Sequence, residues 1–212
     1  MDIIPIALPN PGILHTWIPP EPFEEIRRIA REKINDEYKE GYQNRLVGQI
    51  DHEYAIPEIS PLIEQPLLEM AHKYNEYFPD EGYDIDTNTS EFEVTGSGAW
   101  INYQYKHEYN PIHDHIGMFS FVSWLDIPYT RESELKVAPG QQSSLNCSGT
   151  FSFVYTNIFG EIQNFVPEPN PELLQGRMVL FPARLKHIVY PFYSSDQPRI
   201  SIAGNIVPVP KK

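Results

Sequence analysis

The chain has 212 residues, of which 41% are hydrophobic and 21% charged, so its composition is that of a globular protein with enough residues for a substantial core. Acidic residues outnumber basic ones by 29 to 16, and the formal net charge of −13 disfavours nucleic acids as partners. The sequence contains no apolar stretch of membrane-spanning length and no recognisable secretory signal. Its one cysteine, Cys147, excludes an internal disulfide framework and a thiolate-rich zinc site. We therefore expect a single domain over residues 1–212 in a cytoplasmic protein without membrane partners.

Residues 1–90 have helical or irregular character and are expected to support the rest of the domain. Over residues 20–41 apolar side chains recur at spacings of three and four, which predicts one amphipathic helix. A second helix is expected after Ser60, a favourable N-cap, and Pro79 is expected to end it. Pro66 lies within this second pattern and implies a kink or a later start.

A polar, acidic loop is expected over residues 80–90, and from about residue 91 the pattern changes to strands. The strand segments are short, are rich in aromatic and β-branched residues, and are separated by clusters of turn-forming residues. Short strands without a long intervening helix favour a sandwich or jelly-roll barrel over a parallel α/β sheet. The predicted fold class is α+β and mainly β, with a jelly-roll core over residues 91–212 and the helices packed outside. The predicted strands are Ala99–Lys106, His113–Ile127, Thr150–Thr156, Met178–Phe181, His187–Pro191 and Arg199–Val207.

The segment over residues 129–146 is long, polar and glycine-containing. Its length suits a lid over a binding site, and the plain alternative is a mobile surface loop.

Two histidines in the sequence NPIHDH, residues 110–115, are placed to bind a metal ion. On a strand, side chains two positions apart point to the same face, so His113 and His115 can both project into the barrel while Asp114 points away. Such a pair needs a further ligand from a neighbouring strand, and His187 is the candidate. The site suits Fe(II) with open positions for small ligands, but imidazole also suits zinc and copper, so the pair alone does not choose the metal.

Arg199 and Ser201 alternate onto one face of a later strand in the same way. An arginine in an otherwise apolar strand is costly unless its charge is met, and a carboxylate is the natural partner of its planar fork. That carboxylate belongs either to a ligand or to an internal aspartate or glutamate.

Taken in chain order, residues 99–207 resemble the 2-oxoglutarate/Fe(II)-dependent oxygenase superfamily, specifically its branch related to prolyl hydroxylases. The pattern of that branch reads W-x-N, an asparagine shortly before H-x-H, a hydrophobic strand, then G-R-x-x-L-F-P, a histidine and R-I-S-I. The sequence supplies these elements in order, as Trp100-Ile101-Asn102, Asn110, His113 with His115, Ser120 to Pro128, Gly176 to Pro182, His187, and Arg199 to Ile202.

The resemblance implies a double-stranded β-helix with Fe(II) and 2-oxoglutarate in its mouth. In the family, a histidine of the first motif and the distal histidine bind the iron, and these roles carry over to His113 and His187. The implied activity is that of a dioxygenase that uses 2-oxoglutarate and O2, hydroxylates an unidentified substrate, and releases succinate and CO2.

The cosubstrate contacts are implied by the same resemblance. The family's arginine and the hydroxyl two residues later receive the distal carboxylate of 2-oxoglutarate, which carries over to Arg199 and Ser201. Asn102 occupies a position at which some members contact the cosubstrate. Residues 103–105 are further candidates, because the sequence does not settle which side of that strand faces inward.

One position departs from the family pattern. Most members carry H-x-D, whereas the residue two positions after His113 is His115. Either His115 completes a three-histidine site, or a bulge turns Asp114 inward, and we favour His115 because Asp114 faces away on an extended strand. A neutral imidazole in place of a carboxylate raises the net charge of the metal centre by one unit.

Two other functions fit parts of the sequence. The first is a non-catalytic jelly-roll protein, structural or carbohydrate-binding, with a vestigial metal site. The second is a cupin-type dioxygenase that uses three histidines without a keto acid, and the spacing of Arg199 and Ser201 argues against it because that chemistry needs no carboxylate anchor. The sequence identifies neither the prime substrate nor the oligomeric state.

Overall fold

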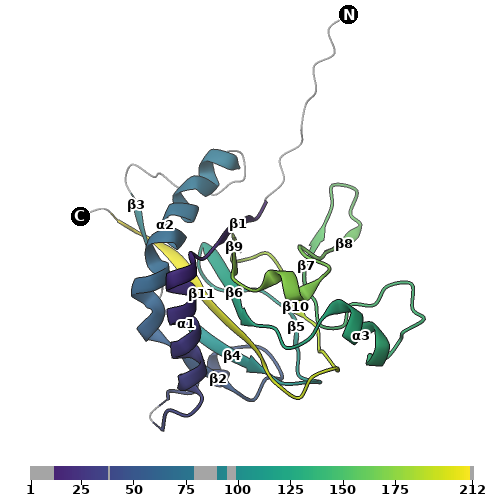
Figure 1. Ribbon diagram of the computed structural model, residues 1–212. Coiled ribbons are helices and arrows are strands. Elements are labelled where there is room, and N and C mark those ends of the chain that lie inside the picture. Colours follow the sequence, from purple (N-terminus) through teal and green to yellow (C-terminus); the bar gives the residue numbers. More distant parts are fainter. Residues whose placement is uncertain (1–11, 38, 79–89, 95–98, 211–212) are drawn as a thin grey trace, which may run out of the picture.

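The structure is a computed structural model that describes residues 12–37, 39–78, 90–94 and 99–210 (Figure 1). It contains two antiparallel β-sheets arranged as a jelly roll, as the sequence predicted. The larger sheet has the strand order β1-β9-β6-β11-β4-β2, with β3 also paired to β11, and the smaller sheet has the order β5-β10-β7-β8.

The strands of the larger sheet are β1 (Leu14–Trp17), β2 (Glu53–Ala55), β3 (Ser90–Val94), β4 (Trp100–Gln104), β6 (Phe119–Asp126), β9 (Arg177–Pro182) and β11 (Arg199–Pro210). Those of the smaller sheet are β5 (Asn110–His113), β7 (Phe151–Thr156), β8 (Ile162–Phe165) and β10 (His187–Val189). The helices are α1 (Pro20–Lys33), α2 (Ser60–Tyr77) and α3 (Arg131–Val137), with short 3-10 turns η1 (Gln43–Arg45), η2 (Pro57–Ile59) and η3 (Pro171–Leu174).

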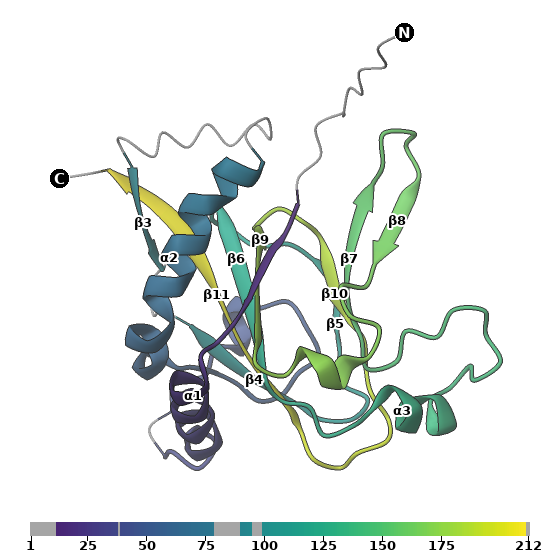
Figure 2. The same ribbon diagram turned by 45° about the horizontal axis from the view of Figure 1, so that its top comes forward.

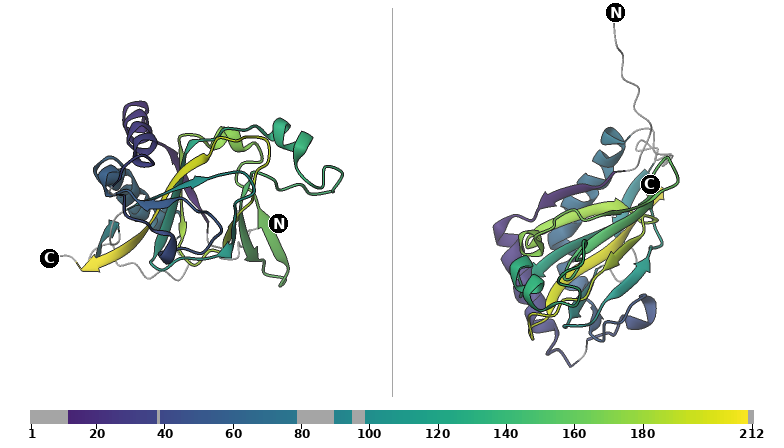
Figure 3. Two further views of the ribbon diagram at one scale, coloured as in Figure 1. Left: turned by 90° about the horizontal axis from the view of Figure 1, so that it is seen from below. Right: turned by 90° about the vertical axis from the view of Figure 1, so that its right-hand side faces the viewer.

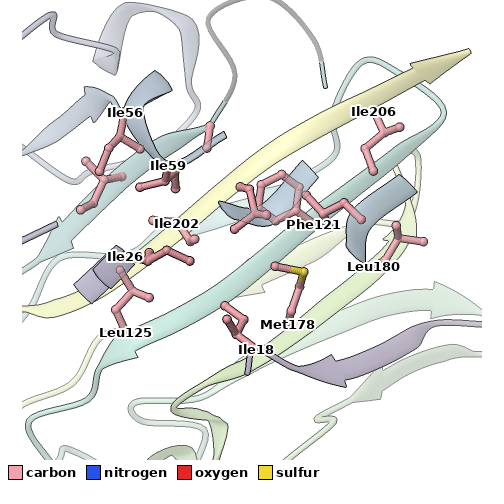
Figure 4. Packing of buried hydrophobic residues seen from close by; sticks show 14 of the residues in the cluster. Ile18, Ile26, Ile56, Ile59, Phe121, Leu125, Met178, Leu180, Ile202 and Ile206 are labelled. Atoms are coloured by element: carbon pink, nitrogen blue, oxygen red, sulfur yellow. The ribbon is translucent and has the colours of Figure 1, made fainter. Parts of the chain in front are cut away.

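The first hydrophobic core lies between the larger sheet and helices α1 and α2, which cover its outer face (Figure 2). Alternate residues of the central strands point to this side, and the helices add their apolar faces. Full burial of one aliphatic or aromatic side chain contributes about 1.5–3 kcal/mol, so this cluster is a main source of stability. Its members labelled in Figure 4 are Ile18, Ile26, Ile56, Ile59, Phe121, Leu125, Met178, Leu180, Ile202 and Ile206.

A second, more aromatic core fills the space between the two sheets. Along β6, Phe121 points to the helices, whereas Val122 and Trp124 point to the smaller sheet. The rings of Trp124 and Phe151 meet edge to face across this space, with their centroids 5.5 Å apart. The buried members of the second core are Val122, Trp124, Phe151, Phe153, Leu174, Val179 and Phe181.

Both predicted helices are present, but their ends differ from the prediction. α1 ends at Lys33 instead of continuing to residue 41. The N–H groups of Asn35 and Asp36 donate to carbonyls three residues earlier, and such residues favour turns over helix interiors.

The second helix starts one residue earlier than expected and accommodates its internal proline. Ser60 is the first residue of α2 and not its N-cap, because the 3-10 turn η2 leads directly into the helix. Pro66 lies inside α2, so the expectation of a later start is wrong. No helix in the described part of the chain is both long and apolar enough to cross a membrane.

One predicted strand, residues 113–127, is in fact two strands in different sheets. β5 ends at His113 and β6 begins at Phe119. Between them Gly117 adopts a φ of +120°, a backbone conformation that side chains disfavour, and the chain crosses there from the smaller sheet to the larger one.

Several elements were not predicted. The segment taken for a lid or loop, residues 129–146, contains α3, which lies beside the smaller sheet and away from α1 and α2 (Figure 3). The short edge strands β1, β2, β3 and β8 were also missed. The polar loop expected over residues 80–90 lies outside the described residues, apart from Ser90 at the start of β3.

Candidate active site

Three histidine side chains converge between the two sheets. His113 ends β5 and is paired with His187 of β10, and the centroids of their rings are 4.2 Å apart. His115 follows β5, and its N–H donates to the carbonyl of Ala183 at 2.8 Å. The Nε2 atoms of His115 and His187 are 3.2 Å apart, and one ring nitrogen from each histidine lies within 4.8 Å of the other two. Nitrogens at about 2.1 Å from a shared cation lie at similar separations, so the three rings have the arrangement of a metal site.

Hydrogen bonds fix the orientation of two of these rings. The Nδ1 of His113 lies 2.7 Å from the carbonyl oxygen of Pro111, and the Nδ1 of His187 lies 3.1 Å from that of Leu185. A carbonyl can only accept, so each Nδ1 carries the hydrogen and each Nε2 keeps its lone pair for a metal.

Burial also holds the three imidazoles in the neutral form that binds metals. Desolvation lowers the pKa of His113, and it lowers the pKa of His187 well below its usual value. Desolvation and the neighbouring His113 lower the pKa of His115 to about 4. All three rings are therefore neutral at pH 7, as metal ligation requires.

Asp114 points away from this cluster, as expected for the middle residue of an extended H-D-H sequence. Its Oδ2 lies 2.9 Å from the Nζ of Lys186 in an ion pair on the surface. The alternative in which a bulge turns Asp114 inward is not the arrangement found.

Arg199 lies beside the same space, and its guanidinium group has only uncharged partners among the residues that the structure describes. Its side chain is 2% exposed. One Nη donates to the hydroxyl of Tyr129 at 2.8 Å and to the carbonyl of Gly149 at 3.0 Å, and the other donates to Oε1 of Gln104. The internal Asp or Glu that could have met this charge is thus not among the partners of Arg199, and the charge is still available for an anionic ligand.

Ser201 and Asn102 lie on adjacent strands next to Arg199. They are paired directly across β11 and β4, and Nδ2 of Asn102 is 3.4 Å from Oγ of Ser201. The Oδ1 atoms of Asn102 and Asn110 are buried without a hydrogen-bond partner. An unpaired acceptor oxygen in a buried site indicates a hydrogen-bond donor that would pair with it, from an ordered water, a ligand or a protonated side chain.

The six residues predicted from the sequence surround one cavity. Its volume is ≈ 50 Å³, measured as the space open to the centre of a water-sized molecule. Leu46 and Val47, which follow η1, cover one edge, and Trp124, Phe151 and Val189 form apolar walls. The predicted residues that line it are His113, His115, His187, Arg199, Ser201 and Asn102.

The structure shows which of the residues next to Asn102 on β4 face the cavity. Gln104 points to the cavity side and binds Arg199, whereas Tyr103 points to the helices, where its hydroxyl donates to the carbonyl of Ala30. Tyr129 was not predicted as a site residue, because it lies in the segment expected to form a lid or a loop. Its contact with Arg199 joins residues distant in the sequence, and no local sequence pattern predicts such a contact.

The residues present fit Fe(II) and 2-oxoglutarate. Three neutral imidazoles suit Fe(II) while leaving coordination positions open. A buried guanidinium without an acidic partner, a hydroxyl and an amide in the same cavity suit a carboxylate ligand. This donor set agrees with the chemistry that the sequence predicted.

Comparison with known protein families points in the same direction. The family model described as "Putative 2OG-Fe(II) oxygenase" matches residues 98–205, which include all six predicted site residues. A prolyl-4-hydroxylase from Pseudomonas putida has a similar structure, with a TM-score of 0.54 and 14% sequence identity over 92% of this chain and 91% of that chain. An oxidoreductase of the 2OG-Fe(II) oxygenase family from Burkholderia pseudomallei has a TM-score of 0.49 and 14% identity, over 92% and 85% of the two chains. At such identity the first likeness concerns the fold alone. No curated protein matches the chain in sequence.

Proposed function

We propose a hydroxylase function for this chain, which belongs to the 2OG-Fe(II) oxygenase family. The family uses Fe(II) and 2-oxoglutarate, so the chain is an oxygenase of that kind. The proposal goes further, to hydroxylation of a C–H bond in an organic substrate with release of succinate and CO2. The observation that carries it is Arg199, a buried cation in the cavity that the three histidines share, whose partners within the described part of the chain are all uncharged.

In this proposal the metal ligands are His113, His115 and His187, each through Nε2. Bound Fe(II) would supply the activation of O2, and 2-oxoglutarate the electrons for it. The two rings whose Nδ1 atoms donate to Pro111 and Leu185 hold their Nε2 atoms in place before the metal arrives.

Arg199 would bind the distal carboxylate of 2-oxoglutarate through its guanidinium hydrogens, with the hydroxyl of Ser201 as a second donor. Tyr129 and Gln104 keep the guanidinium turned toward the cavity. Asn102 would add its amide, since it is paired with Ser201 across the strands and lines the cavity that also holds the histidines.

The aromatic side chains between the sheets would exclude water from the reacting centre. Trp124 is 2% and Phe151 3% exposed, and both line the cavity beside the histidines. A dry, fixed environment strengthens the electrostatic contacts of the cosubstrate and protects reactive species from side reactions.

The test is anaerobic addition of Fe(II) and 2-oxoglutarate, which in the wild type should produce a weak visible charge-transfer band. The variant Arg199→Ala should lose the band, because removing one partner of a buried charged pair costs about 2–5 kcal/mol and weakens binding by at least about 30-fold. Ser201→Ala, a smaller change at the same site, should weaken binding to a lesser extent. Circular dichroism and thermal unfolding establish that both variants are folded.

Arg28→Ala is the matched control. This arginine is on the exposed side of α1, with ion pairs to Glu25 and Glu32, and its loss should leave the band unchanged. Bound iron without a band in the wild type would favour a dioxygenase that needs no keto acid. Absence of iron uptake would favour a structural or binding protein.

A further inference from the structure

Glu53 is a buried carboxyl group on the edge strand β2 of the larger sheet. It is paired directly with Asn102 of β4, which is paired in turn with Ser201 of β11. Residues directly opposite on antiparallel strands point to the same face, with Cβ atoms about 4.5–5.5 Å apart. Glu53, Asn102 and Ser201 therefore form one row on the inner face of the sheet, and the latter two line the cavity.

Glu53 and Asn102 both have an unsatisfied oxygen. Glu53 is 2% exposed, and its Oε1 has no hydrogen-bond partner. The Oδ1 of Asn102 is also buried and also lacks one. Two neighbouring acceptor oxygens are satisfied together only if one of them carries a hydrogen. A carboxyl oxygen can carry one, whereas an amide oxygen cannot.

The surroundings of Glu53 favour its protonated form. Burial, and to a smaller extent the charge of Glu108, raise the pKa of Glu53 to about 8. Glu108 is on the turn after β4, where its carboxylate accepts from the N–H groups of Asp51 and Tyr105.

The other neighbours of Glu53 offer no compensating cation. The inward residues of β4, Asn102 and Gln104, are uncharged, and the guanidinium of Arg199 lies one strand further on, bound by Gln104. The flanking His52 and Tyr54 of its own segment face the other side, where their rings contact each other. None of the ion pairs in the described part of the chain includes Glu53.

We propose that Glu53 is a positioning residue whose protonated carboxyl group donates to Oδ1 of Asn102 and so turns the Asn102 amide nitrogen toward the cosubstrate. The role in cosubstrate binding rests on the proposed function. In this orientation Nδ2 of Asn102 faces Ser201, from which it is 3.4 Å away. Asn102, Ser201 and Arg199 then all present hydrogens to the cavity, which suits a carboxylate ligand.

Ionisation of Glu53 would reverse this arrangement. A carboxylate accepts and does not donate, so it would attract the amide nitrogen of Asn102 and leave Oδ1 facing the anionic cosubstrate. Affinity for 2-oxoglutarate should therefore fall as the pH rises through about 8. The loss of one buried hydrogen bond with an unfavourable contact in its place corresponds to a roughly tenfold weakening.

The experiment measures the dissociation constant of 2-oxoglutarate for the Fe(II)-loaded protein under anaerobic conditions, from about pH 6.5 to about pH 9.5. The wild type should bind roughly tenfold more weakly at the upper end. Glu53→Gln should bind tightly throughout, because its amide donates at every pH. Glu53→Met, similar in length but without a donor, should bind roughly tenfold more weakly throughout while its circular dichroism is unchanged. Glu93→Gln, which alters an exposed carboxyl of β3 in the same sheet, should follow the wild type.

A second readout needs no cosubstrate. The side-chain amide resonance of Asn102, assigned by its loss in Asn102→Asp, should titrate with a midpoint near pH 8 in the wild type and should not titrate in Glu53→Gln. Binding that is independent of pH in the wild type, or a Glu53→Gln variant that weakens in parallel with it, would overturn the inference while the proposed function stands. If no variant binds 2-oxoglutarate, the proposed function fails, and the amide titration alone decides whether Glu53 orients Asn102.

Discussion

Asp114 and His115 are chain neighbours in opposite environments. The carboxylate of Asp114 is in a surface ion pair with Lys186, whereas the ring of His115 faces that of His187 in the interior. Their surroundings differ because successive side chains of an extended segment alternate between faces. Backbone geometry therefore brings His115 and not Asp114 to the histidine cluster, even though a carboxylate is available one residue away.

Replacing His115 with alanine should remove one of the three proposed metal ligands. Outer partners of metal ligands are worth about 10–100-fold in affinity, so loss of a ligand itself should weaken Fe(II) binding by at least about 100-fold. Asp114→Asn disrupts only an exposed ion pair worth about 0–1 kcal/mol and should leave Fe(II) affinity unchanged. Competition with a chromophoric chelator under anaerobic conditions measures both constants. The opposite ranking would make Asp114 the ligand.

The spacing of residues in the sequence was sufficient to predict which side chains line one cavity, but not their supporting partners. His113 and His115, like Arg199 and Ser201, share a face because they are two positions apart, a regularity visible in any strand. Tyr129 reaches Arg199 from a segment 70 positions away, and no local pattern encodes that contact.

The segment from η1 to β2 closes one side of the cavity. It is held to the turn before β5, where the N–H of Gln49 donates to the carbonyl of Tyr109 at 2.9 Å. Gly48 approaches Asn110 so closely that a Cβ there would lie 1.9 Å from Oδ1 of Asn110. The absence of a side chain at this position allows the segment to lie against the cavity wall.

Gly48→Ala should therefore force the segment and Asn110 apart. Overpacking of this kind costs about 1–3 kcal/mol, so the free energy of unfolding measured in urea should fall by that amount. Gly41→Ala is the matched control, because a Cβ there meets only the end of the flexible Gln43 side chain, at 2.8 Å. Equal effects of the two changes would show that the contact with Asn110 is unimportant.

Elements with a long periodic pattern were predictable, and short elements were not. α1 and α2 carry enough apolar periods to be recognised, but the ends of α1 depend on local turn chemistry at Asn35 and Asp36. α3 has only seven residues and depends on its setting, since its buried Glu134 accepts from the N–H groups of Tyr193 and Ser194. β2 has three residues, too few for a visible alternation, so Glu53 could not be placed in advance.

At the scale of the whole molecule, β11 connects the two cores to the site. Its twelve residues pair with three strands, β3, β4 and β6, whereas a strand inside a sheet usually pairs with two. Arg199 and Ser201 face the cavity at one end of β11, while Ile202 and Ile206 pack against the helices. The jelly roll was predictable from the number and shortness of the strands, whereas the pairing of β11 with three partners was not, because register depends on contacts distant in sequence.

The free energy of unfolding of the whole protein should depend on pH in a way that reflects the titration of Glu53. Its pKa is about 8 in the folded state, above the value of about 4.3 for an unfolded chain, so between these pH values the folded state holds one more proton. The free energy of unfolding should consequently fall as the pH rises through this window, by at most about 1.4 kcal/mol per pH unit. Glu53→Gln has no proton to lose and should lack this contribution, so near pH 8 it should be more stable than the wild type by about 1–4 kcal/mol. Urea unfolding at several pH values measures the difference, and parallel curves for the two proteins would contradict the assignment.

The carbonyls of Pro111 and Leu185 bear on how the protein gains and loses its iron. Because they orient two imidazoles in advance, and burial keeps all three rings neutral, binding of iron at neutral pH requires neither the loss of an extra proton from the histidines nor refolding. If the bound ion is oxidised and dissociates, these two imidazoles stay oriented to bind the next ion. The same polypeptide chain should therefore take up Fe(II) again after losing it, without a change in the orientation of these two rings.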